Sequence, residues 1–151
     1  MPMIAVDTRF GRLGIEETGG AITRLVWDGR NEGEASALLR EAAAQMAAYD
    51  QARLERFDLP YRVAGSDFQR QVCDLMYAIP LGETVTYGDI AKQLGRPAQP
   101  VGQACGANPI PVIIPCHRVL GASGLGGFSG DGGVETKVAL LRHEGAAGLL
   151  I

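Results

Sequence analysis

The residues of this 151-residue chain best suited to chemistry are an adjacent cysteine and histidine, Cys116 and His117. A thiolate is the reactive form of cysteine, and neighbouring basic or cationic groups such as His117 and Arg118 favour it. His117 is placed to take the thiol proton, directly or through a water, if a carboxylate orients its ring. Asp131 and Glu144 are the carboxylates near the following glycine-rich loop and final helix. Nucleophilic chemistry is one reading of this pair, and a small buried cysteine at a strand end is the alternative.

Three short segments are expected to position this pair. Residues 111–115, bounded by two prolines, predict a buried strand that leads into Cys116. Seven glycines within residues 121–133 predict a loop whose backbone approaches a ligand closely. Residues 134–143 return to helical spacing, with Gly145 as the stop.

A pair of short helices precedes the cysteine. Thr86 and Asp89 are suited to cap a helix over residues 87–94, and a second helix is expected over residues 97–107 after the turn at Gly95. Two short helices joined by a tight turn form a helix-turn-helix pattern, which by itself is a weak signal. An earlier helix begins after Ser66, with Gln69 in the capping-box position, and stops before Pro80.

The first third of the chain has a different pattern. Short strand-like runs at residues 3–6, 13–16 and 21–27 are followed by a helical stretch at residues 34–54 and a break at residues 57–60. We therefore predict an α/β (α+β) protein with a small strand-plus-helix subdomain at residues 1–56. A mainly helical domain follows at residues 57–151, with the helix-turn-helix and the Pro-Cys-His-Arg-Val turn.

Composition excludes several classes of protein. The chain is 46% hydrophobic and 21% charged, which argues against disorder. No segment reaches the roughly 20 apolar residues needed to span a bilayer, and the N-terminus does not resemble a signal peptide. Three cysteines (Cys73, Cys105 and Cys116) without C-x-x-C spacing argue against a disulfide framework and a zinc site. We expect a cytoplasmic protein without membrane contact or bound metal.

The net charge of −3 argues against non-specific nucleic-acid binding through bulk charge, but the charges are unevenly distributed. Residues 90–130 contain no Asp or Glu, whereas Lys92, Arg96 and Arg118 give that stretch a charge of +3. The helix-turn-helix and Cys116 both fall inside it. DNA binding with modest affinity and a shallow salt dependence is therefore compatible with the acidic total.

Six sequence segments together resemble the O6-alkylguanine-DNA alkyltransferases, also called methylated-DNA–protein-cysteine methyltransferases. The segments keep the family's order and approximate spacing over residues 57–146; they are Phe68–Val72, Val85–Ala91, Asn108–Pro111, Ile114–Val119, Gly127–Gly130 and Leu140–Gly145. The first 56 residues fit the family's variable N-terminal subdomain only loosely.

The resemblance implies stoichiometric DNA repair by direct damage reversal. The family flips an O6-alkylguanine out of double-stranded DNA and moves the alkyl group onto a cysteine, here Cys116, without a cofactor. The counterpart of His117 acts on the cysteine through a water, and that of Glu144 orients the histidine. Asn108 would support the active-site turn, and Tyr87 would protonate guanine N3.

The resemblance also assigns the surroundings of the base and the DNA contacts. Backbone groups of Cys116, Val119 and Ser129 would hold the base edges, Pro111 and Phe128 would form pocket walls, and Lys137 would support the pocket. DNA would be contacted by the start of the second short helix and by the turn, at Ala98, Gln99, Gly102 and Arg118.

The chain departs from the family at two positions expected to meet DNA, Gln99 and Gly106, the second of which is usually basic in the family. Gln99 stands where the family usually has an arginine that enters the minor groove and fills the gap left by the flipped base. A neutral, shorter side chain is expected to weaken duplex repair. The resemblance as a whole predicts a monomeric methyltransferase that reacts once per molecule and is nucleoid-associated if bacterial. The alternative is an alkyltransferase-like protein that senses the lesion without repairing it. A cysteine hydrolase is supported by nothing beyond Cys116 and His117.

Overall fold

The computed structural model describes residues 1–127 and 132–146. The chain divides into two compact units, Met1–Ala64 and Gly65–Ile151. The division falls after Ala64, later than the predicted boundary at residue 56, because residues 60–62 pair with Ile22 of the first unit. Ile22 N donates to Pro60 O at 2.8 Å, and Arg62 N donates to Ile22 O at 2.9 Å. Leu59 is buried, so the segment around the predicted break at residues 57–60 contributes to the core of the first unit.

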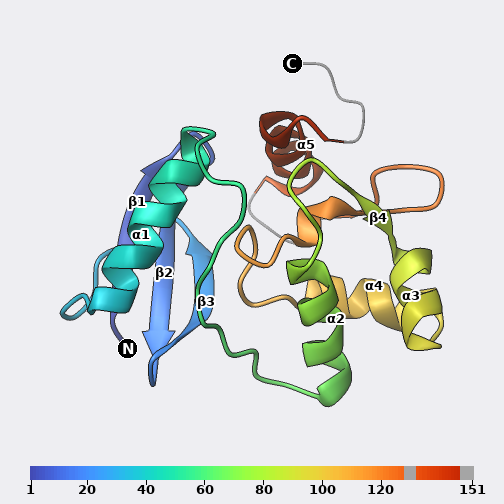
Figure 1. The fold of residues 1–151 in the computed structure, drawn as a ribbon, viewed down its shortest axis with the longest axis horizontal. Helices are drawn as coiled ribbons and strands as arrows, with labels where there is room; N and C mark the ends of the chain where they lie inside the picture. The colour runs from blue at the N-terminus through green and yellow to red at the C-terminus, as the bar shows by residue number, and fades with distance from the viewer. Residues whose placement is uncertain (128–131, 147–151) are drawn as a thin grey trace. The chain divides into compact units, whose positions relative to one another are not determined.

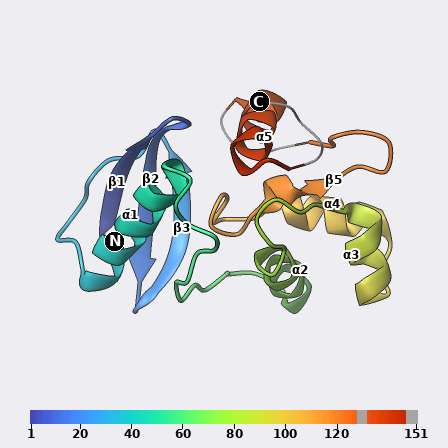
Figure 2. The same cartoon turned by 45° about the horizontal axis from the view of Figure 1, so that its top comes forward.

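The first unit is an antiparallel sheet covered by one helix. Its strands β1 (Met3–Thr8), β2 (Gly11–Thr18) and β3 (Ala21–Trp27) lie in the order β1-β2-β3. Helix α1 (Ala37–Asp50) crosses one face of the sheet (Figures 1 and 2). The core gathers apolar side chains of β2 and β3 and the three- and four-residue stripe of α1: Leu13, Ile15, Ile22, Leu25, Leu39, Ala42 and Met46. The predicted strand-plus-helix subdomain is confirmed, although the helix begins later than predicted because Ser36 caps it.

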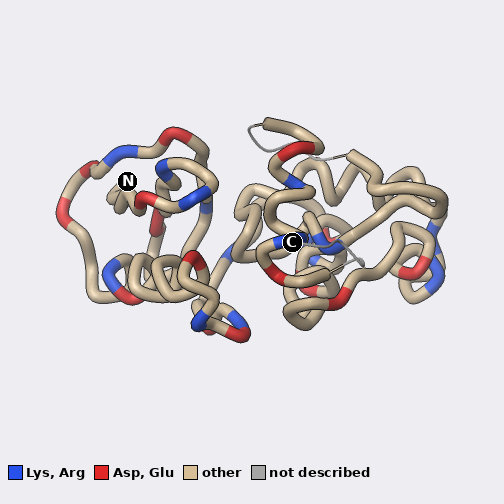
Figure 3. Tube along the Cα trace, turned by 90° about the horizontal axis from the view of Figure 1, so that it is seen from above, with Lys and Arg blue, Asp and Glu red and all other residues tan. Residues whose placement is uncertain are grey.

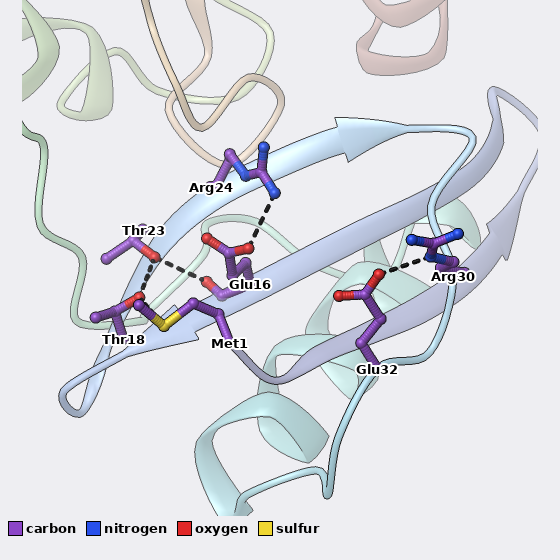
Figure 4. Close-up of polar contacts among 7 residues, drawn as sticks. All are labelled: Met1, Glu16, Thr18, Thr23, Arg24, Arg30 and Glu32. Carbon is purple, nitrogen blue, oxygen red and sulfur yellow. Dashed lines mark hydrogen bonds and ion pairs between the residues drawn. The ribbon is translucent and has the colours of Figure 1, made fainter.

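Exposed pairs of opposite charge run along this sheet. Arg24 meets Glu16 across β2 and β3 at 3.0 Å, and Arg30 meets Glu32 at 2.6 Å (Figure 4). Both signs of charge are spread along the first unit (Figure 3). Exposed pairs of this kind contribute little to the stability of a fold, because water screens the two charges.

The second unit is mainly helical, as predicted. It contains α2 (Asp67–Tyr77), α3 (Tyr87–Leu94), α4 (Ala98–Gly106) and α5 (Gly133–Glu144). Helices α3 and α4 form the helix-turn-helix, visible in Figure 2. Thr86 and Asp89 make a complete capping box at the start of α3, and Gly95 ends α3 at φ +65°. Among the described residues, no helix is long and apolar enough to cross a membrane.

A pair of two-residue strands was not predicted. Strand β4 (Val85–Thr86) runs parallel to β5 (Val119–Leu120), with Val85 opposite Val119. The pairing brings the start of α3 beside the chain that leaves Cys116. Two residues are too few for an alternating pattern, so the sequence carries no signal for these strands.

The predicted strand at residues 111–115 is wrong. This segment is a buried turn in which Val112 has φ +70° and Ile113 N donates to Pro111 O at 2.8 Å. Prolines at positions 111 and 115 cannot donate to a strand ladder, which favours a turn closed on itself. The apolar run is buried all the same, because the turn lies inside the second unit.

Candidate active site

Cys116 begins a single 3₁₀ turn, Cys116–Arg118, that is fixed from the inside. The side chain of Asn108 spans the preceding turn: its Nδ2 donates to Ile114 O at 2.8 Å, and its Oδ1 accepts from Ile110 N at 3.0 Å. Cys116 N donates to Ile114 O at 2.8 Å. An amide side chain that satisfies two buried backbone groups stabilises one conformation of the loop, and so holds the thiol in place.

The Cys116 thiol is 7% exposed. Burial raises its pKa, and this effect outweighs a side-chain hydrogen bond from Asn108 and the positive charge of Lys137, which both lower it. The resting group at neutral pH is therefore a thiol. A base must remove its proton before the sulfur becomes a strong nucleophile.

His117 is the base nearest in sequence and is completely buried. Its Nε2 lies 2.6 Å from Oε2 of Glu144. Burial lowers the pKa of His117, and the hydrogen bond and charge of Glu144 only partly offset this. A neutral ring whose Nε2 faces a carboxylate carries its proton there, which leaves Nδ1 as an acceptor. Nδ1 has no hydrogen-bond partner among the described residues, so it is the atom free to take a proton.

Glu144 is the last residue of α5, and the αL residue Gly145 ends the helix there. Its Oε1 accepts from Nε of Arg118 at 2.8 Å, so each carboxylate oxygen has its own partner. Burial alone would raise the pKa of Glu144. The hydrogen bonds and charges of His117 and Arg118 outweigh burial and hold this pKa at about 2, so the group is a carboxylate at neutral pH.

The expected DNA contact by Arg118 is contradicted. Arg118 is 6% exposed, and its Nη1 donates to the carbonyl of Ile79 at 2.6 Å. Its guanidinium points into the unit, because Glu144 and this carbonyl together satisfy a buried fork of donors. Of the three positive charges counted between residues 90 and 130, Lys92 and Arg96 remain exposed. Arg96 lies over the ring of Phe68, 4.4 Å from the centroid.

Lys137 of α5 is a second fully buried cation. Its Nζ donates to Val119 O at 2.7 Å and to Gly127 O at 3.0 Å, so it ties β5 to the glycine-rich loop. It also lies 5.8 Å from the centroid of the Tyr87 ring. Among the described residues no carboxylate pairs with it, so its charge acts on Cys116 and the aromatic ring of Tyr87.

Tyr87, the first residue of α3, is half-buried. Burial raises the pKa of its phenol, which keeps the hydroxyl protonated at neutral pH, although a backbone hydrogen bond with Gly127 opposes the shift. Gly126, at φ +73°, packs directly on this ring. The arrangement gives a protonated phenol held close to the Cys116 turn.

The other two cysteines belong to the core. Burial raises the pKa of Cys73 to about 11 and that of Cys105 to about 12, so both remain thiols. Gln69 Nε2 lies 3.5 Å from Cys73 Sγ and donates to Ala104 O at 2.8 Å, which joins α2 to α4. Cys105 is buried in the second unit.

The remaining predicted residues that the structure describes form two groups, one at the start of α4 and one buried beside the cysteine turn. Ala98 and Gln99 are exposed at the start of α4 and Gly102 is half-buried, whereas Val101 faces the core. Pro111 and Val119 are buried beside the cysteine turn. Phe128, Ser129 and Asp131 lie outside the described residues. In the described part of the chain, no group of three His, Cys, Asp or Glu side chains is arranged to hold a metal ion.

Sequence reasoning missed two contributors, the carbonyl of Ile79 and the close approach of Gly126. A backbone carbonyl leaves no trace in residue identity. Gly126 is one of many glycines in its loop, and only the structure separates it from Gly124, which has open space around it.

Replacing Gly126 by alanine tests the packing of the loop on Tyr87. A Cβ at position 126 would lie 2.9 Å from Cε2 and 3.0 Å from the hydroxyl of Tyr87, and φ is +73°. We expect Gly126→Ala to lower the free energy of unfolding by roughly 2 kcal/mol, because it adds a clash to a left-handed conformation. Gly124→Ala is the matched control and should change it by less than about 0.5 kcal/mol in urea denaturation. Equal effects of the two substitutions would contradict this packing.

The Glu144 carboxylate should make stability depend on pH. Its pKa is about 2 in the folded protein against an ordinary value of 4.5, so its contribution is present above pH 4.5 and is lost as the pH falls toward 2. The shift corresponds to roughly 3 kcal/mol at neutral pH. Glu144→Gln removes this dependence, so the gap in unfolding free energy between parent and variant should shrink below pH 4.5. A gap that stays constant from pH 7 to pH 2.5 would argue against a buried ionised Glu144.

Comparisons with known proteins agree with this geometry. Residues 67–146 match the family model described as the DNA binding domain of 6-O-methylguanine DNA methyltransferase. The chain is 47% identical over 106 residues to a methylated-DNA–protein-cysteine methyltransferase of Mycolicibacterium paratuberculosis, which covers 68% of this chain and 63% of that relative. A relative of the same name from Methanosarcina acetivorans is 44% identical over 110 residues, which covers 71% of this chain and 69% of that protein.

Solved structures are similar over most of the chain. A crystal structure of Mycobacterium tuberculosis O6-methylguanine methyltransferase has a TM-score of 0.83 at 37% identity, covering 95% of this chain and 92% of that one. Mycobacterium tuberculosis OGT in complex with DNA also has a TM-score of 0.83, at 38% identity, covering 93% of this chain and 91% of that one. The resemblance inferred from the motifs is confirmed: the chain belongs to the 6-O-methylguanine DNA methyltransferase family.

Proposed function

We propose that this protein repairs O6-alkylguanine in double-stranded DNA by moving the alkyl group onto Cys116, once per molecule. The observation that carries the proposal is the buried His117–Glu144 pair, which leaves Nδ1 of His117, the residue after Cys116, as a proton acceptor. Cys116 is a neutral thiol and His117, the next residue, is a neutral base. The base can therefore take the thiol proton when the reaction occurs.

In the proposed reaction the sulfur of Cys116 attacks the alkyl carbon. A C–S bond forms, the bond between that carbon and guanine O6 breaks, and its electron pair leaves with the base. His117 takes the thiol proton at Nδ1, directly or through a water, while Tyr87 gives its phenolic proton to guanine N3. The phenolate and the imidazolium then return to neutrality by proton exchange with solvent. The thioether product has no ready route to hydrolysis, so no second turnover follows.

In the proposed reaction, the positive charge of Lys137 stabilises negative charge on Cys116 and Tyr87. Its position near Cys116 and the Tyr87 ring lowers the cost of forming a thiolate and a phenolate in a buried site. Its two carbonyl contacts also fix the loop that leads to Phe128 and Ser129. In the proposal, Ser129 joins the backbones of Cys116 and Val119 in holding the base.

DNA would be met by the exposed start of α4, at Ala98, Gln99 and Gly102. Two exposed cations, Lys92 and Arg96, give this region a small electrostatic footprint, so we propose weak duplex binding with a shallow salt dependence. The protein would act as a monomer in the cytoplasm, associated with the nucleoid if it is bacterial.

A lesion sensor that binds alkylated DNA without repairing it is the second candidate. Gln99 favours it, since a neutral side chain holds a flipped-out state less well than an arginine. Cys116 argues against it, because a sensor needs no nucleophile.

Methyl transfer separates these two candidates. After incubation under reducing conditions with a duplex containing O6-methylguanine, peptide mass spectrometry should find one methyl group on Cys116. Cys116→Ala should abolish transfer, and Cys105→Ala should retain it, because Cys105 has a pKa near 12 and remains a thiol. Lesion-selective binding without transfer would favour the sensor, and undiminished transfer by Cys116→Ala would refute the assigned nucleophile.

Gln99→Arg tests the DNA-facing position. The added guanidinium should tighten binding to a lesion-containing duplex or speed repair by roughly three- to tenfold, because it adds a charge and a longer side chain at the proposed minor-groove contact. Gln51→Arg adds the same charge in the first unit and serves as the control. If the two substitutions act alike in fluorescence anisotropy and repair kinetics, the effect is bulk charge and the role given to position 99 is wrong.

A further inference from the structure

We propose that Arg118 is a positioning residue for alkyl transfer: it supplies the fixed positive charge that pairs with Glu144, so that His117 remains a neutral base. This inference rests on the proposed function for its catalytic consequence. The effect of Arg118 on the pKa of His117 is a property of the free protein and can be measured without DNA.

The two oxygens of the Glu144 carboxylate contact two consecutive residues, His117 and Arg118. Oε2 of Glu144 lies 2.6 Å from His117 Nε2, and Oε1 lies 2.8 Å from Arg118 Nε. The side chains of Glu144 and His117 are fully buried, and that of Arg118 is 7% exposed. Screening by water is therefore weak, and the charges of the three groups strongly affect one another.

The charges around the histidine decide which group compensates Glu144. Glu144 and Lys137 lie on α5, and Arg118 follows His117 in the 3₁₀ turn. With Arg118 in place, the carboxylate is already neutralised. A proton added to His117 would then place an uncompensated positive charge in a buried site that also faces Lys137. Without Arg118, protonated His117 would become the natural partner of the carboxylate, and Nδ1 would carry a proton that blocks its role as a base.

The shape of the side chain matters as well as its charge. Arg118 reaches Glu144 through Nε and the carbonyl of Ile79 through Nη1, at 2.6 Å, in two directions of one planar fork. Ile79 follows the C-cap of α2, so the fork connects the end of α2 to the end of α5 through the cysteine turn. A lysine would keep the charge but offers a single point of contact.

Two variants separate charge from scaffolding. Arg118→Gln removes the charge and keeps an amide donor, whereas Arg118→Lys keeps the charge and loses the fork. The pKa of His117 is read by NMR titration in the full-length protein, with His143→Gln identifying the resonances. We expect Arg118→Gln to raise this pKa by about one unit or more, and Arg118→Lys to leave it within about half a unit of the parent.

The pH dependence of methyl transfer supplies a second readout. The reaction needs neutral His117, so its rate falls below the pKa of this residue. In Arg118→Gln, the acid limb of the pH–rate profile should move to higher pH by as much as the His117 pKa measured by NMR rises. In Arg118→Lys, the acid limb should stay in place while the transfer rate falls. Two variants that both lose rate with unchanged pKa and acid limb would show that Arg118 acts only as a scaffold, and would overturn the proposal.

Arg118→Gln leaves a buried carboxylate without its counter-charge and is therefore at risk of not folding. In that case the double variant Arg118→Gln/Glu144→Gln decides, because it removes both charges. Recovery of folding in the double variant supports charge pairing, whereas failure of the double variant to fold assigns Arg118 to scaffolding through Ile79. If the parent protein transfers no methyl group, the proposed function fails, and the NMR titration still tests the pairing.

Discussion

The hydrogen bond between His117 Nε2 and Glu144 Oε2 is the interaction on which the proposed chemistry of the second unit depends. Burial by itself works against an active thiol, since it raises the pKa of Cys116 and favours the neutral form. The same burial lowers the pKa of His117, so the base is also neutral. The bond places the ring proton on Nε2 and leaves Nδ1 as a buried nitrogen that can accept a proton. Cys116 and His117 are therefore both neutral at rest, while Glu144 keeps its negative charge.

Segments far apart in sequence keep that bond in place, and each does so through backbone contacts. Asn108 shapes the turn before Cys116, Lys137 links β5 to the glycine-rich loop, and Arg118 fixes the end of α2. Two of these groups are buried cations with backbone carbonyls among their partners. Such contacts are specific in direction, because a misplaced carbonyl would leave a buried charge unsatisfied. This explains how a site with few charged side chains holds a defined geometry.

Much of this could be predicted from the sequence, and the failures have physical causes. Capping residues such as Thr86 and Gly95 predicted where helix α3 begins and ends. The motif around Cys116 indicated the family. The apolar run from 111 to 115 was taken for a strand because burial and hydrophobicity look alike for a strand and for an internal turn. The resemblance and the positive charge of Arg118 favoured a DNA contact, but its side chain is buried against Glu144 and the Ile79 carbonyl. Glu144 lies 26 residues further along the chain, and no local pattern connects the two.

The most direct test of this account is the protonation state of His117 in the free protein at pH 7. Nitrogen-15 chemical shifts of its ring distinguish the neutral tautomers from the imidazolium. The structure predicts a neutral ring protonated at Nε2, with an unprotonated Nδ1. A protonated ring, or a neutral ring with its proton on Nδ1, would contradict the claim that Glu144 holds His117 ready to accept the proton of Cys116.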